Sequence, residues 1–220
     1  MLANYEVKLI EITSEIKSVA DGLLKANKLI VDGLKDCDEK HFTEAKSYIK
    51  NVSNIVKEID NNIITTLALH SPEAKDLRRM VSYLKITNEL LRASSNTRNF
   101  IKGFMEECKN VEKKIIKDYA IPMQKSTVDA IENTVNMLSI DCVDEIQESF
   151  NKVVIAENKT DDLYEMIETA LLLQKPQESD FNKFHKMLVV LRRSERIADR
   201  AMSIASLLLY VNNGGEIHRV

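Results

Sequence analysis

Two acidic residues near the end of the chain, Glu195 and Asp199, lie one helical turn apart, and the first of them interrupts an apolar helical pattern. Glu195 occupies a position of a seven-residue apolar seam, between Leu188 and Met202. A carboxylate at such a position loses hydration, which is costly unless the group is paired or bound to a cation. Asp199 follows four residues later, so both groups share one helix face and repel each other when ionised. This spacing indicates a candidate site for a hard divalent cation.

The segment before this one carries Asp161 and three further acids, which are Asp162, Glu165 and Glu168. If the two segments pair as antiparallel helices, some of these acids approach Glu195, and a cluster of carboxylates is what divalent cations require. The competing interpretation is that Glu195 reaches the edge of the bundle and pairs with Arg192, Arg196 or a lysine of another helix. The spacing alone leaves both open, because Glu-x-x-x-Asp occurs on many solvated helices.

The elements that must position these groups are predicted to be helices. Only 5 Gly, 3 Pro and no Trp occur among 220 residues, which leaves few turns and favours an all-α fold. A Ser71-Pro72 pair has the chemistry of a helix start, and Pro122 predicts that the fourth helix is kinked or begins late. Apolar residues at steps of three and four predict six long helices, over about 4–35, 39–69, 72–107, up to 139, 141–173 and 176–212.

The second and third helices reappear as the fifth and sixth when the sequence is shifted by 104 positions. Pro72 then falls on Pro176 and Arg92 on Arg196, in phase with the apolar stripes. Short connections make neighbouring helices antiparallel. We therefore predict two repeated antiparallel three-helix bundles, one over residues 1–108 and one over residues 109–220.

The first repeat lacks the acidic pair of the second. Leu91 and Ser95 stand at the positions that match Glu195 and Asp199, so the corresponding seam is apolar. An apolar seam offers no ligand to a cation. Any metal site is therefore predicted to be confined to the second bundle.

Charge and cysteine usage exclude several classes of protein. The 31 basic and 34 acidic residues give a net charge of -3 without a basic block, which argues against nucleic-acid binding. The chain has an odd number of cysteines, namely Cys37, Cys108 and Cys142, and no Cys-x-x-Cys pair. This argues against a disulfide framework and against thiolate metal sites. No apolar run approaches the roughly 20 residues of a membrane span, and the N-terminus is charged. We expect a cytoplasmic protein.

Two function classes fit a helical bundle with carboxylates, namely a protein-binding adaptor and a metalloenzyme of the ferritin-like type. The enzyme type needs Glu-x-x-His pairs on two helices, and the sequence has none. No P-loop, dinucleotide-binding glycine motif or nucleophile elbow occurs either. The pattern favours the adaptor.

Two stretches resemble the PhoU family. The sequence RRSERIADRA at 192–201, with the tail at 210–218, resembles the family signature of the last helix, and SPEAKDLRR at 71–79 resembles the start of its third helix. The resemblance implies two three-helix bundles related by pseudo-twofold symmetry, with a divalent or iron-type metal ion bound through Glu-x-x-x-Asp motifs. Glu195 and Asp199 match the second motif, and Asp161 matches an acidic position of the preceding helix. Leu91 and Ser95 depart from the first motif, and Ser53 stands where the family tends to have Asn or an acid.

The resemblance also implies a function and partners. It implies regulation of phosphate uptake and phosphate-starvation signalling, through contact with the ATPase of a phosphate ABC transporter and a sensor histidine kinase, with membrane association only through such partners. An accessory protein of another phosphate or cation permease is the alternative.

Amphipathic helices with Leu2, Tyr5 and Val111 exposed are also compatible with a homodimer through a twofold interface.

Overall fold

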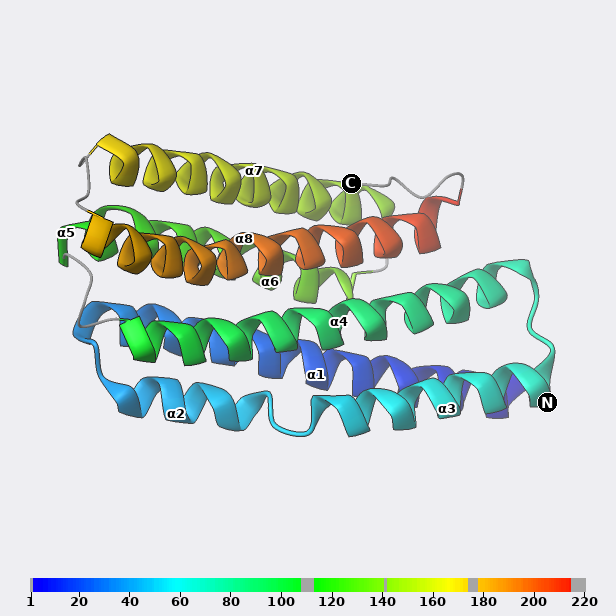
Figure 1. The fold of residues 1–220 in the computed structure, drawn as a ribbon. Coiled ribbons are helices and arrows are strands. Elements are labelled where there is room, and N and C mark those ends of the chain that lie inside the picture. The colour runs from blue at the N-terminus through cyan, green and yellow to red at the C-terminus, as the bar shows by residue number, and fades with distance from the viewer. Residues whose placement is uncertain (1, 108–112, 141, 174–177, 215–220) are drawn as a thin grey trace.

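A computed structural model describes residues 2–107, 113–140, 142–173 and 178–214, and within these ranges the chain is helical and has no strand. Figure 1 shows helices stacked side by side along a common direction. None of the helices described is long and apolar enough to cross a lipid bilayer. The elements in chain order are α1 (Leu2–Asp36), α2 (Glu39–Tyr48), α3 (Val52–His70), α4 (Ala74–Glu107), α5 (Lys113–Ile115), the π-helical turn η2 (Ile116–Ala120), α6 (Ile121–Met137), α7 (Val143–Leu173) and α8 (Glu178–Asn213).

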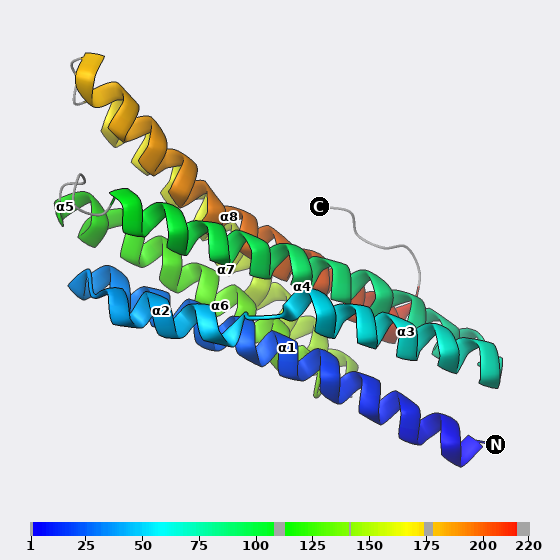
Figure 2. The ribbon, with the colours of Figure 1, turned by 60° about the horizontal axis from the view of Figure 1, so that its bottom comes forward.

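The helices form two groups that meet along α4 and α8. In Figure 1, α1 to α4 lie in the lower part of the view and α6 to α8 in the upper part, with α4 and α8 running in opposite directions side by side. Figure 2 shows the same pairing, with the beginning of α8 pointing away from α4. The predicted all-α fold of two repeated antiparallel three-helix bundles is thereby confirmed. The domain boundary at 108/109 stays a prediction, since residues 108–112 are outside the described ranges.

The helix predicted over 39–69 is wrong as a single helix, because it is broken between α2 and α3. The chain leaves the helix at Ile49, and Asn51 adopts a left-handed conformation with φ 63°. Asparagine tolerates this conformation better than most residues. Gly22 of α1 faces the break, and a Cβ atom there would lie 2.9 Å from the carbonyl oxygen of Tyr48. The break therefore depends on a contact between helices that local periodicity does not encode.

The irregular start predicted for the fourth helix is present. The π-helical turn η2 precedes α6, and Pro122 lies in the first turn of α6. Proline has no N–H to donate to the carbonyl of residue 118, and its ring crowds that carbonyl in a regular α-helix. A widened turn removes this conflict, and the N–H of Ile121 bonds to the carbonyl of Ile116 instead.

Tyr5, predicted to be exposed on a dimer surface, is instead buried at 6% exposure, with its ring edge against His70. The Leu2 side chain and Val111, proposed with it, are outside the described residues, as are the expected helix-start residues Asp141 and Pro176.

A chain of buried polar side chains joins the two repeats at the centre of the molecule. Asn27 of α1 donates a hydrogen bond to Thr97 of α4 at 3.2 Å and accepts one from Gln124 of α6 at 2.9 Å. The carbonyl oxygen of Gln124 in turn accepts from Ser194 of α8 at 2.6 Å. All four residues are fully or almost fully buried. Satisfied buried networks of this kind fix the register of neighbouring helices.

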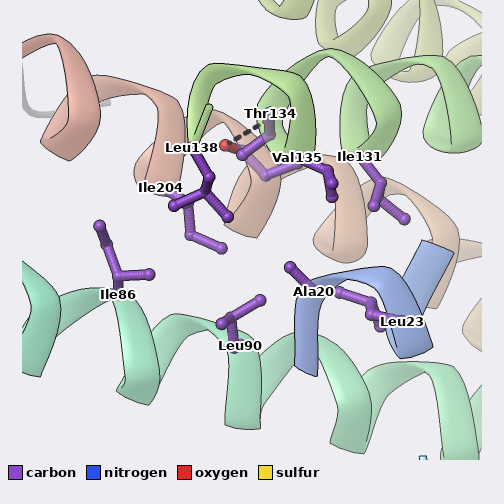
Figure 3. Close-up of a pocket in the computed structure, with 10 residues that line it drawn as sticks. Ala20, Leu23, Ile86, Leu90, Ile131, Thr134, Val135, Leu138 and Ile204 are labelled. Carbon is purple, nitrogen blue, oxygen red and sulfur yellow. Dashed lines mark hydrogen bonds between the residues drawn. The ribbon is translucent and has the colours of Figure 1, made fainter. Parts of the chain in front are cut away.

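Next to this network lies a small cavity of about 10 Å³, shown in Figure 3. Its lining comes from α1, α4, α6 and α8 and is apolar apart from Thr134, whose hydroxyl donates to the carbonyl of Ala201 at 3.2 Å. A cavity of this size holds one water molecule at most, and apolar cavities stay dry. It is a packing defect at the junction of the repeats and not a ligand site.

Candidate metal centre and adjoining arginine groove

Three carboxylates converge where α7 packs against α8. Glu157 and Asp161 are one turn apart on α7, and Asp199 faces them from α8. One carboxylate oxygen from each lies within 4.8 Å of the other two. Oxygen ligands of this kind, brought together from two helices, match the preference of hard divalent cations.

Glu195 borders this group one turn before Asp199. Its side chain is only 15% exposed, and its Oε2 atom is buried without a hydrogen bond, as is Oδ1 of Asp161. Buried carboxylate oxygens without a partner are rare because their desolvation is not compensated. The nearest positive group to Oε2 of Glu195 is the Arg192 guanidinium at 3.4 Å, and a bound cation would compensate both oxygens more closely, so the residues present fit a metal.

The electrostatics of the cluster favour the same conclusion. Burial, followed by the charges of Asp161, Asp199 and Glu195, raises the pKa of Glu157 from 4.5 to about 7. Burial is also the largest cause that raises the pKa values of Asp161, Glu195 and Asp199, although nearby arginines act in the opposite direction. Without a cation, the cluster therefore holds a proton up to a higher pH than an isolated carboxyl group would.

The structure brings together two of the three predicted ligands, Asp161 and Asp199, and places Glu195 beside them. It also adds Glu157, which the sequence analysis missed, although Glu157 and Asp161 have the same Glu-x-x-x-Asp spacing as Glu195 and Asp199. That repeated spacing on two consecutive helices was the available signal. Whether a metal is bound stays a prediction.

The first repeat has no such cluster within the described part of the chain. Under the shift of 104 positions, Ser53 matches Glu157 and Lys57 matches Asp161. Leu91 and Ser95 match the other two acids, Glu195 and Asp199. Ser53, Lys57 and Ser95 are exposed, and Leu91 packs against the core.

An open, strongly polar groove of about 620 Å³ runs between α4 and α8, directly beside the carboxylates. Glu195 and Asp199 form part of its wall, so the candidate metal centre and the groove share two side chains. Its other lining residues are five arginines and three small polar residues, namely Arg92, Arg192, Arg193, Arg196, Arg200, Ser95, Asn96 and Asn99.

Several of these arginines make polar contacts across or along the groove. Arg200 contacts Glu89 of α4 at 3.0 Å and Asp199 at 3.7 Å. Arg192 lies over the ring of Tyr164 at 5.1 Å, and its Nε is 3.4 Å from Oε2 of Glu195 without the alignment of a hydrogen bond. The carboxylate cluster is thereby connected electrostatically to the first repeat.

Comparison with known proteins agrees with the duplicated architecture. The PhoU domain matches twice, over residues 16–102 and 121–208. Two crystal structures have the same fold: PhoU from Pseudomonas aeruginosa, with a TM-score of 0.82 at 18% identity over 96% of this chain and 100% of that one, and the phosphate transport system regulatory protein PhoU from Streptococcus pneumoniae, with a TM-score of 0.80 at 17% identity over 98% and 100%. The molecule is a duplicated helical-bundle protein.

Curated relatives match nearly the whole chain. A phosphate-specific transport system accessory protein PhoU homolog from Clostridium acetobutylicum is 24% identical over 222 residues, covering 97% of this chain and 96% of the relative. PhoU homolog 1 from Methanothermobacter thermautotrophicus is 22% identical over 213 residues, covering 94% and 93%. With the PhoU domain matched in both halves, the chain belongs to the PhoU family.

Proposed function

We propose that the chain is an accessory protein of a phosphate transport system and regulates phosphate uptake and phosphate-starvation signalling. The observation that carries this proposal is the match of both repeats to the PhoU domain, supported by full-length relatives named as phosphate-specific transport system accessory proteins. The chain acts as a cytoplasmic adaptor, and its partners are the ATPase of a phosphate ABC transporter and a sensor histidine kinase. It performs no catalysis of its own.

Uptake of radiolabelled phosphate in cells with and without the chain tests this role. With phosphate in excess, cells lacking the chain should take up phosphate faster and should leave starvation genes switched on, because a negative regulator is missing. Co-purification with the transporter ATPase from the same genome tests the contact directly. Unchanged uptake together with no co-purification would contradict the proposal.

The alternative is an accessory protein of another phosphate or cation permease. The genes beside this one discriminate between the two, since a phosphate ABC transporter operon supports the first role and a lone permease gene supports the second.

We further propose that the second repeat binds a divalent or iron-type metal ion through Glu157, Asp161 and Asp199, with Glu195 beside them as a fourth carboxylate. The support is the convergence of three carboxylate oxygens within 4.8 Å and the two buried carboxylate oxygens, Oδ1 of Asp161 and Oε2 of Glu195, that accept no hydrogen bond. The cluster described contains only carboxylates, which favours a regulatory or structural ion over the histidine-containing sites of carboxylate-bundle enzymes.

Metal analysis of the purified protein tests this site. Asp161→Asn should lower divalent-metal affinity by more than the roughly 10- to 100-fold that loss of an outer-shell partner costs, because a direct ligand is removed. Asp162→Asn is the matched control, since Asp162 is the next residue on α7 and its side chain is exposed. Equal metal affinity of the two variants would contradict the site.

A further inference from the structure

The groove between α4 and α8 contains more positive charge than its acids account for. Arg92 and Arg200 share Glu89, Arg192 approaches Glu195, and Arg193 donates to the side-chain oxygen of Asn96 at 3.4 Å. Arg196 lines the groove and is exposed, and its charge acts to lower the pKa values of Glu195 and Asp199, but it makes no hydrogen bond or close ion pair within the described residues. Arginines at steps of four on one helix face, such as Arg192, Arg196 and Arg200, repel one another.

The geometry of the groove follows the internal symmetry of the chain. Glu89 contacts Arg200, and Arg193 contacts Asn96. Under the shift of 104 positions Glu89 matches Arg193 and Asn96 matches Arg200, so each contact is the symmetry counterpart of the other. The pseudo-twofold axis between the repeats therefore passes through this part of the α4–α8 interface.

The same antiparallel register places Arg92 close to opposite Arg196, and these two arginines are themselves symmetry mates. Arg92 is present in the first repeat although that repeat has Leu91 and Ser95 in place of the acids, so its presence does not depend on a local Glu-x-x-x-Asp motif. Both arginines line the groove with exposed side chains, and guanidinium groups are donors of the kind that bind anions.

From these observations we infer that the α4–α8 groove binds a phosphate oxyanion, held between Arg92 and Arg196. Arginine donors match the oxygens of a tetrahedral oxyanion, and Asn96 and Asn99 offer further neutral donors in the same lining. The ligand is either free inorganic phosphate or the terminal phosphoryl group of a nucleotide, since both present this chemistry.

The carboxylates in the groove wall discriminate among anions. Inorganic phosphate at neutral pH keeps at least one O–H group, which can donate a hydrogen bond to the Glu195 carboxylate in the groove wall. Sulfate has no O–H group, so its oxygens are only repelled by that carboxylate. The groove should therefore prefer phosphate to sulfate. The inference goes beyond the proposed function, because it needs neither the metal nor a protein partner, and it would let the accessory protein respond to phosphate itself.

Calorimetric titration of the full chain at physiological salt tests the site with inorganic phosphate, sulfate and ADP as probes. We expect saturable binding of inorganic phosphate or ADP, and the tighter of the two identifies the source of the phosphoryl oxygens. Arg92→Gln and Arg196→Gln should each weaken this binding by about 10- to 100-fold, as expected for loss of a charged hydrogen-bond donor. Glu195→Gln should reduce the preference for phosphate over sulfate.

Arg98→Gln is the matched control, because it makes the same charge change on α4 but contacts the carbonyl of Ile49 at 3.2 Å, away from the groove. Circular dichroism confirms that each variant is folded, and metal content is measured on every sample. The inference is overturned if the wild-type protein shows no saturable binding at millimolar phosphate and ADP. It is also overturned if the Arg92 and Arg196 variants bind as well as the Arg98 variant, or if binding follows metal content and not the arginines.

Discussion

The two repeats have the same helical frame and different chemistry at matching positions. In the second repeat, Glu157, Asp161 and Asp199 converge and Glu195 borders them. In the first repeat, the matching residues are Ser53, Lys57, Leu91 and Ser95, and the helices pack without any of these acids. The fold therefore does not require the carboxylates. The four acids of the second repeat repel one another, so they do not stabilise the fold, and binding of a ligand explains their presence better.

Exchange of the two sets of residues is the strongest test of this comparison. A fourfold variant copies the first repeat into the second through Glu157→Ser, Asp161→Lys, Glu195→Leu and Asp199→Ser. We expect this variant to stay folded and to lose metal binding. In chelator, its melting temperature should equal or exceed that of the wild type, because buried repulsive charges are removed. Metal analysis and thermal melts measure both effects.

The reciprocal exchange, Ser53→Glu, Lys57→Asp, Leu91→Glu and Ser95→Asp, sharpens the comparison. If the shared frame is sufficient, this variant should bind additional metal. Unchanged metal content after the first exchange would show that the carboxylates of the second repeat are not ligands.

A smaller effect is expected where the two repeats are joined. Asn27→Ala leaves the amide of Gln124 and the hydroxyl of Thr97 without their buried partner and should cost about 1–3 kcal/mol of unfolding free energy. That corresponds to a fall of roughly 2–10 °C in melting temperature for a protein of this size. Asn62→Ala removes an exposed amide that contacts Glu15 and is the control. Equal melting temperatures of the two variants would mean that the buried network does not stabilise the junction.

The smallest expected effect is a pH dependence of the melting temperature, which arises from the carboxylates of the second repeat. The pKa of Glu157 is raised to about 7 in the folded chain, so the folded state binds this proton more tightly than the unfolded state does. In chelator, the melting temperature should therefore rise as the pH falls from about 7.5 towards 5, in the window between the folded pKa and the ordinary value of 4.5. Glu157→Gln should flatten this dependence. With a divalent cation present, the trend should reverse, because protons then compete with the metal.

Much of the fold could be predicted from the sequence because helical periodicity is a local signal. The break between α2 and α3 could not, since Ala45, Ile49, Val52 and Val56 keep the spacing of an uninterrupted helix. The break depends on a left-handed Asn51 and on the approach of Gly22, which lies in another helix. Nonlocal contacts of this kind have no periodicity to detect.

The candidate site was predictable to a similar extent. Glu195 was visible because it interrupts an apolar seam, and Asp199 because it follows four residues later on the same face. Asp161 was distinguished from the other acids of the preceding helix only by the resemblance to the PhoU family. Glu157 was missed because an acid on a charged helix looks solvated until the rotation of α7 against α8 is known, and only that rotation leaves it at 8% exposure. The arginine groove was hidden for the same reason, since its two walls are α4 and α8, far apart in the chain.

The exchange of the Glu89–Arg200 and Arg193–Asn96 contacts under the 104-residue shift has an evolutionary consequence. In a symmetric homodimer, every contact across the axis occurs twice with the same residues. Fusion of two copies of one gene would convert such a subunit interface into the α4–α8 junction and would free each copy to mutate alone. The present asymmetry, an ion pair on one side and an arginine–amide pair on the other, is what divergence after such a fusion leaves.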